Sequence, residues 1–185
     1  MPNFRKSMVA GGATDVRTFD QGALLKKNKT LKPQGVCSPL ALIWIKHQSK
    51  NTSFADAIRT DAGLEEVLFI ERLKKSEKDF CKAYLTDYNL HAHFEQKLYP
   101  PMYNGLKRIL VAGPGYYFVG GNEAVWANES VGGHAFAVDM FTNVFFDSNC
   151  GSAKFTTGQA TAEGLIKWLG EGYPEYNMGV IQRFF

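Results

Sequence analysis

This sequence contains a cysteine, a histidine and an aspartate in an order that is typical of nucleophilic acyl chemistry. Cys37 stands in the segment QGVCSPL, His134 in GGHAFAV and Asp147 in FFDSN. A thiolate can attack a carbonyl carbon, an imidazole can activate the thiol and protonate the leaving group, and a carboxylate can fix the imidazole tautomer. The order Cys, His, Asp therefore predicts a cysteine hydrolase with Cys37 as nucleophile, His134 as general base and acid, and Asp147 as the group that orients His134.

The cysteine needs an element that presents it to a substrate. The segment that follows Gly35, CSPLALIWIKH, predicts a helix whose first turn contains Pro39, a position where no amide donor is needed. Cys37 is then at the helix N-terminus. There the helix dipole and the free amides favour the thiolate and offer a backbone donor to a developing oxyanion.

The histidine and the aspartate need a hairpin. His134 begins an apolar run that predicts a strand up to Met140, and a turn near 139–143 returns the chain through Val144-Phe145-Phe146 to Asp147. The two residues are 13 positions apart, a gap that two short strands and a tight connection span. Cys37 must be brought to them by packing of its helix on the sheet.

The remaining pattern predicts helices first and a sheet second. Helical spacing of apolar residues occurs at 54–73 and 77–90, and β-rich runs follow Pro100-Pro101 at 109–111 and 116–119. A short helix at 162–169 and a closing strand at 179–185 complete the chain. We predict an α+β fold, with a single domain over 34–185 whose N-terminal helical part packs on a C-terminal antiparallel sheet.

Residues 1–33 differ from the rest in composition and charge. Seven lysines and arginines precede Pro33 against two acids, although the whole chain carries a formal charge of only +3. Periodicity is poor, so we predict a basic arm or a partly ordered lead-in that adds little packed core. The overall charge is too small to indicate a nucleic-acid partner.

The cysteine count and the hydropathy indicate the compartment. Three cysteines without paired spacing argue against a disulfide scaffold and for folding in a reducing compartment, where a free thiolate persists. No stretch approaches the roughly 20 apolar residues of a membrane span, and the N-terminus lacks the apolar core of a secretory signal. We expect a soluble protein that, if exported, uses a route other than that signal.

The same residues carry a resemblance to a known family. The pattern Gly35-x-Cys37-x-x-Leu40, the strand GHAxAV at 133–138 and the segment FDxNxG at 146–151 resemble the YopT-type cysteine proteases, which are papain-like effectors and toxin domains of bacteria. The resemblance covers roughly residues 34–155. The sequence departs from the cathepsin group, whose third catalytic member is Asn and whose cysteine is followed by Trp, where this chain has Ser38.

The resemblance implies a papain-like fold and cleavage of a peptide bond through a thioester. It implies a virulence protein that a bacterium secretes by a non-Sec route and that acts in the host cytoplasm on itself or on a host GTPase or kinase. The basic lead-in would suit contact with an anionic membrane. It implies no cofactor and no metal. Two alternatives stay open: a deamidase, transglutaminase or acyltransferase with the same triad, and a binding module with an inactive triad.

The second donor of the oxyanion hole is the least determined part of the site. In the resembled family a side-chain amide upstream of the cysteine joins the cysteine's own backbone amide. Gln34 is the nearest candidate, only three positions before Cys37, and Asn28 and Gln21 are alternatives.

Other chemically capable residues have simpler interpretations. Cys81 is predicted to be a core thiol and Cys150 a surface thiol near Asp147. His91 and His93 form only half of a zinc site, so we place them at a helix end or in a loop. The glycines at 113–121 predict turns between strands, because no lysine and no strand-to-helix context accompanies them. Aromatic residues in the sheet half are either core or the wall of a substrate cleft: Tyr116, Tyr117 and Trp126.

Overall fold

A computed structural model describes residues 2–28, 36–123 and 133–185 of the chain. Its helices are α1 (Phe4–Ala10), α2 (Gln21–Lys27), α3 (Cys37–Ser49), α4 (Phe54–Ala57), α5 (Asp61–Ser76), α6 (Phe80–Thr86), α7 (Met102–Val111) and α8 (Gly158–Gly172). Its strands are β1 (Asp15–Thr18), β2 (Ala92–Leu98), β3 (Tyr116–Glu123), β4 (Gly133–Asp139), β5 (Val144–Asp147), β6 (Gly151–Lys154) and β7 (Tyr176–Phe184).

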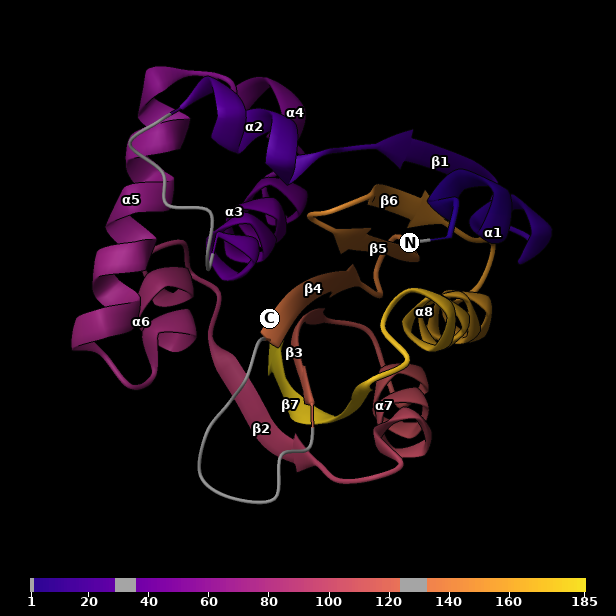
Figure 1. The fold of residues 1–185 in the computed structure, drawn as a ribbon. Helices are drawn as coiled ribbons and strands as arrows, with labels where there is room; N and C mark the ends of the chain where they lie inside the picture. Colours follow the sequence, from indigo (N-terminus) through magenta and orange to yellow (C-terminus); the bar gives the residue numbers. More distant parts are fainter. Residues whose placement is uncertain (1, 29–35, 124–132) are drawn as a thin grey trace.

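The strands form one antiparallel sheet with helices on both faces. Their order is β1-β6-β5-β4-β3-β7-β2. Figure 1 shows α3 to α6 on one side of the sheet and α7 and α8, with α1 above them, on the other. Alternate side chains of each strand enter the two cores, so that Phe136 faces α8 while Ala135 and Ala137 face α3. The predicted α+β class, with the cysteine helix packed on the sheet that carries His134 and Asp147, is confirmed.

The cysteine helix α3 lies at the centre of its layer. Every residue from Cys37 to Ile45 is buried. Strands β3, β4 and β5 contact one side of the helix, and α4, α5 and α6 contact the other. A helix enclosed in this way must be apolar all round. This is why the segment ALIWI lacks the polar stripe of a surface helix.

The hairpin of β4 and β5 has the predicted connection. The Asp139 carboxylate accepts hydrogen bonds from the backbone N–H groups of Phe141 and Thr142 at 2.8 and 3.1 Å, and Asn143 adopts a left-handed φ of 60°. The register places Asp147 directly opposite Phe136. Since residues two apart on a strand share a face, His134 and Asp147 both point toward the α8 side of the sheet.

The N-terminal lead-in is part of the packed structure as far as Asn28. Phe4 and Met8 of α1 and Val16 of β1 are buried in the α8-side core, and β1 pairs with β6 along Asp15–Thr18. The expectation of little packed core from residues 1–33 is therefore wrong for the described part. Phe4 and Met8 have helical spacing, but a single pair in a short polar segment is a weak signal, and Val16 joins them only through the tertiary structure.

Two further predictions of secondary structure are wrong. Residues 109–111, predicted as a strand, end helix α7, whose buried residues Met102, Leu106, Ile109 and Leu110 follow helical spacing. His93, placed at a helix end or in a loop, lies in strand β2, because pairing with β7 stabilises a polar sequence that has little strand character of its own. Within the described ranges, no helix is both long and apolar enough to cross a membrane.

Candidate active site

Cys37 is the first residue of α3. The helix begins there, and the backbone N–H of Leu40 closes its first turn on the carbonyl of Val36 at 3.0 Å. The side chain is buried, with 8% of the residue exposed, and the thiol is hydrogen-bonded to the His134 side chain and to the backbone of Ala135. No acidic residue lies in the first turn of the helix to oppose a thiolate. Cys37 therefore sits where the helix dipole favours negative charge.

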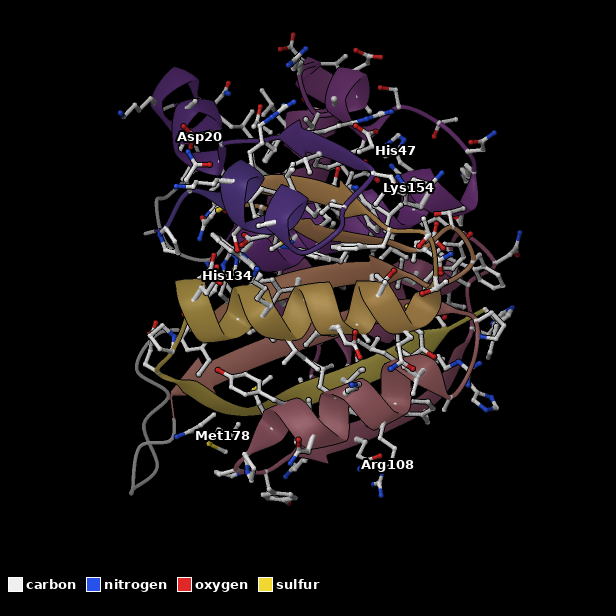
Figure 2. The ribbon with its side chains drawn as sticks, turned by 90° about the vertical axis from the view of Figure 1, so that its right-hand side faces the viewer. Asp20, His47, Arg108, His134, Lys154 and Met178 are labelled. Atoms are coloured by element: carbon white, nitrogen blue, oxygen red, sulfur yellow. The ribbon has the colours of Figure 1, made fainter. Side chains whose placement is uncertain are left out.

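His134 connects the thiol to the carboxylate. It lies near the start of β4, and its Nε2 atom is 2.8 Å from Oδ1 of Asp147. With Nε2 donating to the carboxylate, Nδ1 is the ring nitrogen that remains to exchange a proton with Cys37. The residue is only 6% exposed. Figure 2 shows it at one end of the sheet, beside an end of the gold helix α8.

The Asp147 carboxylate is fully buried and has several donors. Oδ1 accepts from His134 and from the backbone N–H of Asn149 at 2.8 Å each. Oδ2 accepts from the indole Nε1–H of Trp168 at 2.7 Å and from the hydroxyl of Tyr173 at 2.9 Å. A buried charge is tolerated only when it is paired and hydrogen-bonded. These contacts keep Asp147 ionised and fix its plane relative to His134.

Tyr173 also holds the histidine ring. The two rings are stacked at 5.0 Å between centroids with an interplanar angle of 15°. The side-chain amide of Asn149 donates to the Tyr173 hydroxyl at 3.0 Å, which fixes the hydroxyl so that its own hydrogen points at Asp147. The imidazole is thus restrained by a hydrogen bond at its edge and by a ring against its face.

The electrostatics favour a thiolate and imidazolium pair. Burial alone would raise the pKa of the Cys37 thiol, but the hydrogen bond and the positive charge of His134 outweigh it and bring the pKa below its ordinary value. Burial opposes the charged form of His134 as well, yet the hydrogen bonds to Asp147 and Cys37 raise its pKa to about 9. The Asp147 pKa is lowered, because contacts with His134 and Trp168 exceed the cost of burial. A lowered Cys37 pKa beside a raised His134 pKa favours transfer of the thiol proton to the imidazole.

Two solved structures share this architecture. The Pseudomonas avirulence protein AvrPphB matches 92% of this chain over 97% of its own length, with a TM-score of 0.61 and 15% identity. PatoxP, a cysteine protease-like domain of the Photorhabdus asymbiotica toxin PaTox, matches 97% of this chain over 56% of its own length, with a TM-score of 0.50 and 18% identity. This chain has the AvrPphB fold. No protein-family model and no curated protein matches the sequence.

Within this AvrPphB fold, the three candidates for the second oxyanion donor are Gln34, Gln21 and Asn28. Gln34 lies outside the described residues. The side chain of Gln21 is engaged by the turn after β5, where its amide contacts Asn149 and its Oε1 accepts from the Ser148 hydroxyl at 3.0 Å. Asn28 donates back to the carbonyl of Leu24 in its own helix. Neither described alternative is aimed at the thiol, and Gln34 remains a prediction.

The other two cysteines differ from Cys37 in the direction of their pKa shifts. Cys81 is buried among apolar residues of α6, as predicted, and burial raises its pKa well above the ordinary range. Cys150 was predicted to be a surface thiol, but it is half-buried. Burial, the negative charge of Asp147 and the hydrogen bond to that carboxylate raise the pKa of Cys150 to about 12. Cys81 and Cys150 therefore remain thiols at neutral pH. Of the three cysteines, only Cys37 has a lowered pKa.

Three further predictions concern residues around the site. Tyr117 is fully buried and belongs to the core, and Tyr116 lies at the far end of β3 from His134. Trp126 lies outside the described residues. In the described part of the chain, no group of three or more His, Cys, Asp or Glu side chains is placed to hold a metal ion.

Sequence reasoning missed two hydrogen-bond partners of Asp147, Trp168 and Tyr173. The helix predicted at 162–169 was assigned no role in the site. It runs on to Gly172 and carries Trp168, and Tyr173 follows directly after its last residue, so that both side chains donate to Asp147. Their only sequence signal is weak: an indole and a phenol five residues apart, each of which needs a polar partner when buried.

Proposed function

We propose that this protein is a cysteine peptidase that uses Cys37, His134 and Asp147. The observation that carries the proposal is the continuous chain of contacts from the thiol at the N-terminus of α3, through the imidazole, to a buried carboxylate with four N–H and O–H donors. The likeness in fold to AvrPphB, and to a domain that is described as cysteine protease-like, supports a related role for this chain.

The chemistry follows from the protonation states. The Cys37 thiolate attacks the carbonyl carbon of the scissile peptide, and the backbone N–H groups at the start of α3 stabilise the oxyanion. His134 gives its proton to the leaving amine as the C–N bond breaks, which leaves a thioester on Cys37. His134 then takes a proton from water, the hydroxide attacks the thioester, and the thiolate returns as the acid product leaves. Asp147 keeps one tautomer of His134 throughout.

The setting that we propose is bacterial virulence. Both structural neighbours come from bacteria, and their names describe an avirulence protein and a toxin domain. The resemblance to YopT-type proteases makes a host protein, such as a GTPase or a kinase, or the chain itself, the proposed substrate. The exposed basic residues of the lead-in, including Arg5 and Lys6, would add weak attraction to an anionic membrane.

The test compares new protein N-termini in a host-cell lysate treated with wild type and with Cys37→Ala. Wild type should create N-termini that Cys37→Ala does not, and Asp147→Asn should lower their yield by about 10² or more. Cys81→Ala is the matched control, because it removes another buried thiol away from His134, and it should cleave like wild type.

The same set of new N-termini in the lysates treated with wild type and with Cys37→Ala would reject the proposal that this protein is a peptidase. The intact masses of the same targets would then report on the alternatives. Deamidation adds about one dalton and amine transfer adds the mass of the amine, both through the same Cys-bound acyl intermediate.

A further inference from the structure

The two edges of the sheet are different, and β2 is the open one. Among the described strands, β2 pairs with β7 alone, so its outer row of backbone N–H and C=O groups faces away from the sheet. Most of its residues are exposed, and only Phe94 and Leu98 are buried or partly buried. Figure 1 shows β2 along the outer side of the sheet, below α6.

The opposite edge, β1, is shorter and partly covered. It spans Asp15–Thr18, helix α1 packs against it, and the guanidinium of Arg5 reaches the carbonyl of Val16 at 3.5 Å. An incoming strand would have to displace this contact. The sheet therefore offers one long edge for pairing with another chain.

The residues of β2 are complementary to themselves about Gln96. If a second β2 runs antiparallel with Gln96 opposite Gln96, then Glu95 of each copy lies opposite Lys97 of the other, and Phe94 lies opposite Leu98. Two-fold symmetry makes each of these pairs occur twice. A parallel arrangement in register would instead place Glu95 against Glu95 and Lys97 against Lys97, which is repulsive.

The side chains of β2 are already oriented for this pairing. Phe94 and Leu98 belong to the α7-side core, so a second copy would extend that core across the junction. Glu95 and Lys97 lie on the other face and are exposed, and Glu95 is held over the sheet by the Gln182 amide at 2.5 Å. The regular ladder ends at Phe94, because the strand bulges between Ala92 and Phe94.

An exposed tyrosine extends the same surface. Tyr99, directly after β2, is 68% exposed, the largest exposed fraction among the large apolar side chains described. In the antiparallel arrangement it reaches the bulge of the second copy, where His93 packs edge-on against Phe185 at 5.3 Å. Exposed aromatic rings at a sheet edge gain contact area when the edge is covered.

We propose that two copies of this chain associate through antiparallel pairing of their β2 strands, centred on Gln96. The contact is isologous, since the same patch serves both partners, and it closes as a dimer. The two sheets become continuous through β2. The thiol of each copy is carried by α3, on a different element from the junction, so the association is independent of the peptidase proposal.

The decisive experiment is a charge exchange followed by sedimentation over a broad concentration series. Wild type should show a monomer–dimer equilibrium. Glu95→Lys alone places Lys opposite Lys97, and Lys97→Glu alone places Glu opposite Glu95, so each should weaken association about tenfold or more. An equimolar mixture of the two variants restores both opposite-charge pairs, and it should dimerise within about threefold of wild type.

Matched changes on β1 control for net charge. Asp15→Lys and Arg17→Glu make the same charge changes at exposed positions of the other edge, and neither should alter the dissociation constant, alone or mixed. Circular dichroism of all four variants should match wild type, because every changed side chain is at the surface. A wild type that stays monomeric throughout, a mixture no tighter than its components, or a loss of association in the β1 variants would each overturn the proposal.

Discussion

At the scale of residues, Asp147 is the group on which the site depends. A buried carboxylate is costly unless its oxygens are fully hydrogen-bonded. Here three side chains donate hydrogen bonds to the Asp147 carboxylate: His134 from β4, Trp168 from α8, and Tyr173 from the residue that follows α8. Because the same Tyr173 ring also stacks on the imidazole, the carboxylate and the histidine are held by shared supports rather than separate ones.

The thiolate and imidazolium pair predicts an unusual pH dependence of alkylation. The rate at which iodoacetamide modifies Cys37 should already rise below the ordinary thiol pKa of 9.0, because His134 lowers the Cys37 pKa. It should rise a second time near pH 9, where His134 loses its proton and the thiolate loses its positive neighbour. The measurement is intact mass against time over a pH series.

His134→Ala should collapse this profile to a single step, no lower than the pKa of an ordinary thiol, since burial then acts without the imidazolium. A single step in wild type that does not move in His134→Ala would contradict the pair and would favour an inactive binding module.

The hydrogen bond from the Tyr173 hydroxyl to Asp147 should stabilise the folded protein in a pH-dependent way. Asp147 has a lowered pKa in the folded state, so its stabilisation is present above the unfolded pKa and is lost as the pH falls through the folded pKa. Tyr173→Phe removes one donor and keeps the ring. It should lower the free energy of unfolding by about 1.5–3 kcal/mol at pH 7, and by less in acid.

Urea unfolding of the same variant at pH 7 and in acid measures this difference. Tyr103→Phe is the control: the buried Tyr103 hydroxyl has no hydrogen-bond partner among the described residues, so its removal should cost nothing. Equal losses in the two variants, or a Tyr173→Phe loss that is independent of pH, would argue against the link to Asp147.

At the scale of elements, the turn between β5 and β6 ties the site to the N-terminal strand. Gly151 follows Asp147 by four residues and begins β6, where it pairs with Thr18 of β1. Its φ of 129° is in a region that side chains rarely adopt, and an added Cβ would lie 1.9 Å from the carbonyl oxygen of Arg17. Only glycine lets β1 approach β6 at this point.

Gly151→Ala should therefore lower the free energy of unfolding by about 3 kcal/mol, through backbone strain and loss of the β1 pairing. Gly170→Ala is the matched change: this glycine lies inside α8 with no atom within 4 Å of an added Cβ, so alanine should stabilise by about 0.5–1 kcal/mol. Thermal and urea unfolding measure both. A Gly151→Ala protein as stable as wild type would refute the close approach.

At the scale of the whole molecule, the first helix supports the site from outside it. Phe4 packs edge-on against Trp168 at 4.9 Å and against Phe145 at 6.0 Å, and Trp168 donates to Asp147. The N-terminal lead-in is thus joined to the Asp147 carboxylate through one tryptophan, Trp168. Truncation of this segment would open the α8-side core next to the site.

Phe4→Ala should cost about 3–5 kcal/mol of stability, because it leaves a cavity beside Trp168. It should also slow the alkylation of Cys37 at pH 7 as Asp147 loses its fixed position. Val9→Ala on the same helix is 56% exposed before the change and should have an effect within about 0.5 kcal/mol. Similar unfolding curves for the two variants would show that α1 is only a surface appendage.

Local signals in the sequence account for part of this protein. The apolar run after Cys37 predicted α3 and its N-terminal thiol, and the strand-turn-strand pattern from His134 to Asp147 predicted the hairpin, because each rests on neighbours within a few residues. The tertiary structure alone decided that Phe4 and Val16 complete a core, that β2 is a strand, and that Trp168 and Tyr173 bind Asp147. Such contacts join residues far apart in the chain. The free energy of these contacts comes from burying apolar side chains and from hydrogen-bonding the buried Asp147 carboxylate. It depends on the packed structure, so a local pattern of residues does not predict it.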